Sequence, residues 1–218
     1  MSDLPHSRAW YARLGREQSV YAHPWRRVLS GPDPEETFDG LLAALLTPHA
    51  QVLEAGCGHG PDAVRFGARA ARWVAYDFVP EWVAAAQANA PHAEVHLWDG
   101  RGEVPAPLRG PFDLIVSRRG PTSVIRHLPA LAAPDARFLY VGPRLDVPQV
   151  PAELEAAGWR VLGEWRASVL AHAPTRTDWQ RRCEWMNEPD RVAEWDRQAR
   201  AAGLPYREER YTVLAAPA

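Results

Sequence analysis

Residues 51–60 of the chain read QVLEAGCGHG. The first half of this stretch, Gln51 to Ala55, is a short and largely apolar run, which is typical of a buried strand. Its second half places glycine at positions 56, 58 and 60. Glycines permit a tight turn and let backbone N–H groups approach a ligand closely. The stretch therefore predicts a strand that ends in a ligand-binding loop.

Strand-like and helix-like segments alternate on both sides of this stretch. Apolar residues at helical spacing precede it between Phe38 and Leu46, which predicts a helix. Strands joined by helical crossovers pair in parallel. The pattern predicts an α/β fold, a doubly wound, mostly parallel seven-stranded sheet with an antiparallel last strand. The remaining elements expected in its first part are helices at 61–70 and 80–89 and strands at 72–77, 93–97, 112–117 and 137–141.

The two ends of the chain differ from this regular middle. Residues 1–35 are polar and aromatic and are predicted to form an N-terminal lid or extension, which ends near Gly31-Pro32-Asp33-Pro34. Residues 36–218 are predicted to form the main domain, with a helical insertion at about 175–204. Within it, the last third is expected to contain a helix at 151–158, a long strand at 159–170 and a closing strand at 210–214.

Acidic and aromatic residues follow two more of the expected strands. Asp77 ends the second strand, and Trp98-Asp99-Gly100 follows the third. An ionised Asp77 can accept hydrogen bonds from both hydroxyls of a ribose, because a carboxylate is only an acceptor. Asp99 can accept from an adenine amino group, and Phe78 and Trp98 offer apolar surface to its ring. Ligands of open α/β sheets bind beyond the carboxyl ends of the strands, so these groups predict an adenosine site.

The spacing of the glycines distinguishes between adenosine-containing ligands. A dinucleotide-binding loop reads Gly-x-Gly-x-x-Gly, whereas this loop reads Gly-x-Gly-x-Gly, with Glu54 two residues ahead of Gly56. An acid would repel a diphosphate and attract the ammonium group of a methionine moiety. The loop therefore disfavours a nicotinamide dehydrogenase.

At these motifs the chain resembles the class I S-adenosylmethionine-dependent methyltransferase family. The matching segments are VLEAGCGHG at 52–60, AYDF at 75–78, LWDG at 97–100, FDLIVS at 112–117 and RFLYVG at 137–142. The resemblance covers roughly residues 38–170. It implies S-adenosylmethionine as cofactor and a methyl transfer from its sulfonium. The implied cofactor contacts are Glu54, Gly56, Cys57, Gly58, Gly60, Asp77, Phe78, Trp98, Asp99, Gly100 and Ser117.

The chain departs from the family after its fourth motif. That motif often continues with Asn-Pro-Pro-Tyr or a histidine, whereas here it continues Ser117-Arg118-Arg119-Gly120-Pro121. This difference leaves the methylated atom, and whether a general base is used, open. Arg118 or Arg119 could clamp an anionic substrate, and a structural ion pair is an equal alternative. Tyr11, Tyr21 and Trp25 are predicted to contact the substrate if the N-terminal segment is a lid.

The composition excludes several other activities. All 25 cationic residues are arginine, so a P-loop and Schiff-base chemistry, which both require lysine, are excluded. No metal site is expected, because the two cysteines lie far apart, and because His92 and His96, four residues apart in an extended segment, would be too far apart for easy chelation. The sequence shows no apolar run of membrane-spanning length and no signal peptide. With two cysteines and no disulfide framework, a cytoplasmic protein is expected.

The sequence supports three functions. The first is a methyltransferase for a small-molecule acceptor, favoured by the modest size and the net charge of −2. The second is an RNA or protein methyltransferase, because a local basic patch can form in a folded chain even though no basic tail exists. The third is a non-catalytic S-adenosylmethionine-binding regulatory domain. The oligomeric state is left open.

Overall fold

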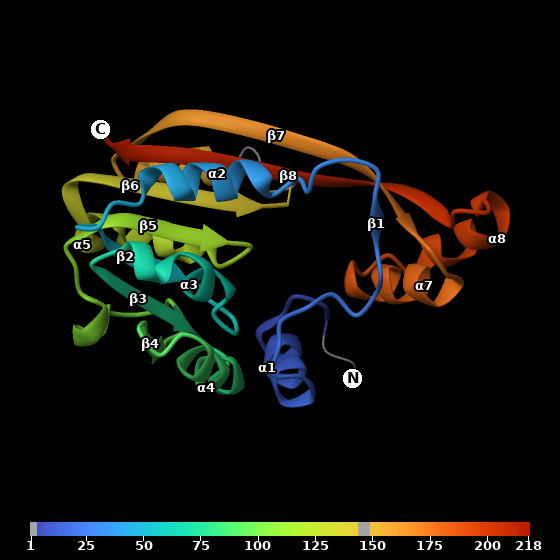
Figure 1. The fold of residues 1–218 in the computed structure, drawn as a ribbon, viewed down its shortest axis with the longest axis horizontal. Helices are drawn as coiled ribbons and strands as arrows, with labels where there is room; N and C mark the ends of the chain where they lie inside the picture. Colours follow the sequence, from blue (N-terminus) through green and yellow to red (C-terminus); the bar gives the residue numbers. More distant parts are fainter. Residues whose placement is uncertain (1–3, 144–148) are drawn as a thin grey trace. The chain divides into compact units, whose positions relative to one another are not determined.

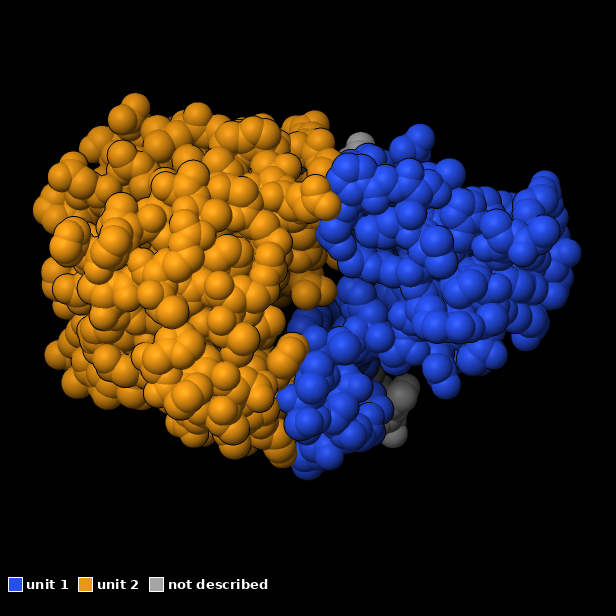
Figure 2. Space-filling model, viewed as in Figure 1, with its two compact units in different colours: residues 1–34, 168–209 blue, residues 35–167, 210–218 orange. Residues whose placement is uncertain are grey.

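The computed structural model describes residues 4–143 and 149–218 (Figure 1). The chain divides into two compact units (Figure 2). The first consists of residues 1–34 and 168–209, and the second of residues 35–167 and 210–218. The chain therefore enters the second unit only after the Gly31–Pro34 turn, and returns to it for the last nine residues.

The second unit is built on a mostly parallel sheet. Strands β2 (Gln51–Ala55), β3 (Arg72–Asp77), β4 (Glu94–Leu97), β5 (Phe112–Arg118) and β6 (Ala132–Gly142) pair in parallel in the order β6-β5-β2-β3-β4. Most residues of β2, β3 and β5 are buried, as expected for central strands covered on both faces. Strand β8 (Leu204–Pro217) pairs antiparallel with β6. Strand β7 (Trp159–Ala173) is the next neighbour of β8 in the hydrogen-bonded order.

Helices cover both faces of this sheet, so the doubly wound α/β architecture is confirmed. Helices α2 (Glu36–Leu45), α3 (Pro61–Phe66) and α4 (Pro80–Asn89) share one apolar cluster with the sheet, and they lie on the same side of it in Figure 1. The second cluster joins the other face to η2 (Ala106–Leu108), η3 (Thr122–His127), α5 (Leu128–Leu131) and α6 (Gln149–Ala156). Burying this apolar area at about 25 cal/mol per Å² is the main driving force for the fold.

The first unit has a small core of its own. It contains α1 (Arg8–Glu17), β1 (Val28–Leu29), α7 (Arg176–Trp185), η5 (Pro189–Ala193), α8 (Glu194–Gln198) and the adjoining ends of β7 and β8. Trp179, Cys183 and Leu204 are central to its apolar cluster. The insertion predicted at about 175–204 is helical here, and the structure groups it with the N-terminal residues in one unit.

Several predicted boundaries were wrong, each for a physical reason. The described residues form eight strands rather than seven, because β1 has two residues and leaves no periodic pattern. Strand β8 begins at Leu204 rather than Arg210. Its first half contains Glu208, Glu209 and Arg207, which resemble a loop in sequence. Helix α3 ends at Phe66, and a 3-10 turn, η1 (Gly67–Arg69), completes the predicted helix.

Candidate functional site

The glycine loop lies where β2 and β3 end side by side. Ala55 pairs with Tyr76 in register, and the N–H groups of Gly56 and Cys57 both donate to the Tyr76 carbonyl at 2.9 and 3.0 Å. Gly56 and Gly60 have φ of 72° and 83°, a region that residues with a side chain rarely adopt. The loop thus turns sharply at the carboxyl edge of the sheet, as the sequence predicts.

Gly56→Ala is expected to destabilise the protein through two separate effects. A Cβ at this position would lie 2.5 Å from Cδ of Pro121 and 3.0 Å from Cα of Gly120. The positive φ costs about 1–2 kcal/mol, and the overpacking adds about 1–3 kcal/mol. Gly102→Ala is the matched control, since Gly102 has φ of 68° and no neighbour within 4 Å of such a Cβ. Urea unfolding measures the free energy of unfolding of both variants. If Gly56→Ala and Gly102→Ala lose the same amount, the contact with Pro121 contributes nothing to the effect.

Asp77 is brought directly against this loop. The Gly58 N–H donates to Asp77 Oδ2 at 2.9 Å, and the Val79 N–H donates to Oδ1 at 3.0 Å. The carboxylate is 6% exposed. Burial raises the pKa of Asp77, while hydrogen bonds from Val79, Gly58 and Phe78 act in the opposite direction. A carboxylate has about four acceptor positions, so with three N–H donors at least one position remains for a ligand hydroxyl.

The aromatic segment after β4 lies beside Asp77. The backbone N–H of Trp98 donates to the Asp77 backbone carbonyl at 3.0 Å. The Trp98 ring meets Tyr76 edge to face, with centroids 4.8 Å apart. Asp99 accepts from the Arg101 N–H at 3.0 Å, Phe78 is half-buried, and Gly100 has φ of 68°. Acceptor groups and ring surface are thus gathered at the ends of β3 and β4.

Tyr76 was missed by sequence reasoning. It is 1% exposed, and its hydroxyl has no hydrogen-bond partner within residues 4–143 and 149–218. A Cβ on Gly100 would lie 3.7 Å from that hydroxyl. Buried polar groups are rarely left without a partner, so an unsatisfied hydroxyl beside the Trp98 segment is consistent with a polar ligand there. The sequence did contain a signal for Tyr76. It directly precedes Asp77 at the end of β3, and because neighbouring residues of a strand face opposite sides of the sheet, its side chain lies on the other face from Asp77.

Two predicted cofactor residues, Glu54 and Cys57, are buried in the protein interior. Glu54 is 3% exposed and accepts a hydrogen bond from the Trp73 indole at 2.9 Å. Burial raises the pKa of Glu54 well above its usual range, and the Asp62 carboxylate adds to the increase. Burial likewise raises the pKa of Cys57, followed by the effect of Glu54, so its thiolate is disfavoured. The role of Glu54 beside a methionine ammonium stays a prediction.

The segment after β5 packs on the opposite side of the loop from Asp77. Gly120 approaches so closely that a Cβ there would overlap the Ala55 carbonyl oxygen. Ser117 is fully buried, and its hydroxyl lacks a hydrogen-bond partner in the described part of the chain. The structure therefore brings Ser117 to the loop, as predicted, next to the two arginines.

Arg118 is held by three carboxylates. Its guanidinium contacts Asp62 at 2.8 Å, Glu35 at 3.0 Å and Asp39, and it lies over the Phe38 ring at 4.4 Å from the centroid. Burial alone would lower the pKa of Arg118, but these carboxylates raise it above its usual range. Of the two alternatives for Arg118, this geometry supports the structural ion pair, which joins α2, α3 and β5.

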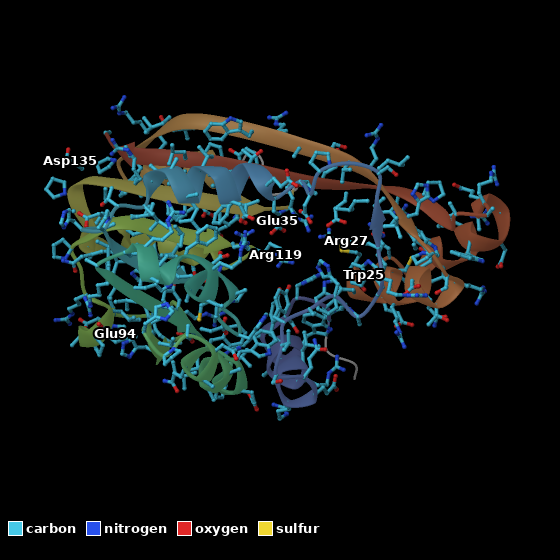
Figure 3. All side chains as sticks on the ribbon, in the orientation of Figure 1. Trp25, Arg27, Glu35, Glu94, Arg119 and Asp135 are labelled. Carbon is cyan, nitrogen blue, oxygen red and sulfur yellow. The ribbon has the colours of Figure 1, made fainter. Side chains whose placement is uncertain are left out.

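Glu35 links Arg118 to two further arginines. It lies 3.3 Å from Arg119 Nε and 2.9 Å from Arg210 Nε, and Figure 3 shows Glu35 and Arg119 beside each other. Burial alone would raise the pKa of Glu35, but Arg119, Arg210 and Arg118 lower it to about 2. Glu35, Asp39, Asp62 and Arg210 were all missed in the sequence, where nothing relates them to Arg118.

Glu35 is expected to make the protein more stable at neutral pH than in acid. Its pKa falls from 4.5 to about 2 on folding. Its stabilisation is therefore complete above pH 4.5 and is lost as the pH falls toward 2. A shift of this size corresponds to about 3 kcal/mol. Urea unfolding measures the free energy of unfolding at pH 7 and at pH 3. The difference between these two values should be smaller in Glu35→Gln than in wild type. The exposed neighbour Glu36→Gln is the control, and identical differences in both variants would contradict the assignment.

The predicted substrate residues Tyr11, Tyr21 and Trp25 lie in the first unit. They belong to an aromatic cluster around Trp185, whose centroid lies 5.8 Å from Tyr21 and 5.7 Å from Trp25. Tyr11 and Tyr21 are 6.1 Å apart. All three predicted residues are half-buried. The cluster gives the N-terminal residues a packing role, and their contact with substrate stays a prediction.

Neither a metal-binding cluster nor a membrane-spanning helix occurs among the described residues. No group of three or more His, Cys, Asp or Glu side chains there is arranged to hold a metal ion. None of the described helices combines the length and apolar character needed to cross a membrane.

Comparisons with known proteins agree with this geometry. The profile of a methyltransferase domain matches residues 52–137, which contain the glycine loop, Asp77 and the Trp98 segment. No curated protein is similar enough in sequence to match. A crystal structure of a protein of unknown function from Deinococcus radiodurans R1 is 64% identical, with a TM-score of 0.88, and covers 97% of this chain and 100% of that one.

Two more distant structures share the fold. A candidate methyltransferase from Bacillus halodurans C-125 is 15% identical, with a TM-score of 0.66 and coverage of 84% of this chain and 100% of that one. Magnesium protoporphyrin IX methyltransferase from Synechocystis PCC 6803, solved with bound S-adenosylmethionine, is 17% identical, with a TM-score of 0.55 and coverage of 84% and 79%. The matched domain identifies residues 52–137 as a methyltransferase domain, and together with the shared fold of these structures it supports assigning the chain to the class I S-adenosylmethionine-dependent methyltransferase family.

Proposed function

We propose that this enzyme transfers the methyl group of S-adenosylmethionine to a small-molecule acceptor. One observation carries the cofactor assignment. The ends of β2, β3 and β4 bring the glycine loop, Asp77 and the Trp98-Asp99-Gly100 segment into direct contact. In this proposal Asp77 accepts from the ribose hydroxyls, Asp99 accepts from the adenine amino group, and Phe78 and Trp98 border the ring.

The cofactor supplies an activated methyl group on a positive sulfonium. The chain's own task is to hold the acceptor at attack distance and to exclude water, which accounts for several kcal/mol of the barrier in such reactions. A general base is needed only where the acceptor must lose a proton early. The high pKa and burial of Cys57 make it unsuitable as a nucleophile, so we assign it to packing within the loop.

A small acceptor is favoured by the charge of the chain. The net charge is −2, with no lysine, whereas nucleic-acid binding depends largely on neutralising phosphates. The magnesium protoporphyrin IX methyltransferase carries a small-molecule acceptor in its name, although similarity at this level concerns the fold. The two cysteines are free thiols, which fits the cytoplasmic location that we propose.

An assay for S-adenosylhomocysteine release tests this proposal. Purified enzyme is given S-adenosylmethionine with a small-molecule library in one arm, and with total RNA or a protein extract in two others. Release that depends on a small molecule supports the proposal. Release in the RNA arm that falls steeply with salt would replace it with an RNA methyltransferase. Cofactor binding without release in any arm would favour a non-catalytic domain.

A further inference from the structure

The order of the strands separates the two ends of the proposed cofactor. Asp77 and Trp98, the proposed adenosine contacts, follow β3 and β4, on one side of β2. Strand β5 lies on the other side of β2, with Glu54 paired to Val116 in register. A cofactor whose adenosine lies over β3 and β4 must extend its amino-acid end across the loop toward β5. The residues after β5 are therefore the ones that this end would meet.

Arg119 is the first residue after β5, and its backbone is fixed in an uncommon conformation. It has φ of 52°, which is rare for a residue other than glycine and occurs disproportionately at functional sites. Its N–H donates to the Val141 carbonyl of β6 at 2.7 Å. The next two residues, Gly120 and Pro121, pack directly on Gly56. Arg119 is thus fixed between β6 and the glycine loop.

The side chain of Arg119 differs from that of Arg118 beside it. The Arg118 side chain is 10% exposed, whereas that of Arg119 is 28% exposed and has Nε 3.3 Å from Glu35. A guanidinium has five N–H donors in a planar fork, so Arg119 can keep Glu35 and still bind a second carboxylate. Its charge also acts on the loop. Burial lowers the pKa of His59, and the positive charge of Arg119 lowers it further.

We propose that Arg119 binds the carboxylate of the cofactor's methionine moiety and so selects S-adenosylmethionine over nucleosides that lack an amino-acid tail. This inference rests on the proposed cofactor site. It assigns the adjacent arginines to different tasks: Arg118 holds α2, α3 and β5 together, and Arg119 recognises the ligand. Glu35 sits between the two and orients the Arg119 guanidinium.

Calorimetric binding of two ligands tests the proposal without any acceptor. The first ligand is S-adenosylhomocysteine, and the second is its analogue with hydrogen in place of the carboxylate. Arg119→Gln should weaken S-adenosylhomocysteine binding by about 10- to 100-fold, the usual effect of losing a charge-assisted pair of hydrogen bonds, and should leave binding of the analogue unchanged. Arg119→Lys should recover part of the loss. Glutamine also has a Cβ, so the backbone strain at this position does not change.

Arg137→Gln is the matched control. Arg137 is half-buried and lies in the middle of β6, where it donates to the Asp135 and Ala136 carbonyls. The Arg137→Gln variant should bind both ligands with the affinity of wild type. If Arg119→Gln binds S-adenosylhomocysteine normally, or weakens both ligands equally, the carboxylate assignment is wrong. If wild type binds neither ligand, the cofactor site itself is wrong, so the two failures are distinguishable.

Discussion

Asp77→Ala is expected to weaken S-adenosylhomocysteine binding about 10- to 100-fold. A hydrogen bond from a ribose hydroxyl to a carboxylate contributes about 1.5–3 kcal/mol, which corresponds to about 10- to 150-fold in affinity. The measurement is calorimetric titration of both proteins at one pH. The variant also removes the acceptor for the Gly58 and Val79 N–H groups, so some loss of stability is expected as well.

A modified ligand separates recognition from this structural effect. S-adenosylhomocysteine without its 2′ and 3′ hydroxyls cannot donate to Asp77. Wild type should bind it weakly, and Asp77→Ala should bind it no more weakly than wild type does. If the substitution weakens both ligands by the same factor, Asp77 shapes the loop but does not bind the ribose.

Arg118→Met is expected to lower the free energy of unfolding by about 3–5 kcal/mol, because removing one partner leaves buried charges uncompensated. Glu35, Asp39 and Asp62 all contact this guanidinium. Glu35 and Asp39 also contact other arginines, whereas the Asp62 side chain is only 1% exposed, so its charge is the one most affected. For a chain of this length the loss corresponds to a fall of about 6–20 °C in the unfolding midpoint. Differential scanning calorimetry at pH 7 measures it.

The control for Arg118 is Arg65, a second arginine that pairs with one of its three carboxylates, Asp39. The Arg65 side chain is 50% exposed. Exposed ion pairs contribute about 0–1 kcal/mol, so Arg65→Gln should shift the midpoint by a few degrees at most. Equal shifts in the two variants would show that Arg118 is not the centre of the network.

Local patterns made the central sheet and its loop predictable. Strands β2, β3 and β5 are short apolar runs bounded by turn residues, and each was placed within one residue of its observed bounds. The position of Asp77 against the loop followed from the rule that ligands bind at the carboxyl edge of parallel strands. These features depend on residues that are close in sequence or fixed by one topology.

The ion network and the division into units could not be predicted in the same way. Arg118 meets Glu35, Asp39 and Asp62 across 83, 79 and 56 residues, and no periodicity relates such positions. The tertiary structure also joins the N-terminal residues to α7 through Trp10 and Trp185, whose centroids are 4.6 Å apart. Pairings between distant residues depend on the finished fold, so they appear only once it is known.

Thermal unfolding with S-adenosylhomocysteine, the product of the proposed methyl transfer, tests whether this site binds the cofactor. A ligand at a hundred times its dissociation constant adds about 2.7 kcal/mol to stability. The unfolding midpoint should therefore rise by roughly 5–10 °C with S-adenosylhomocysteine, and should not change with NAD. A rise with NAD alone, or no rise with either ligand, would show that the glycine loop and Asp77 do not form an S-adenosylmethionine site.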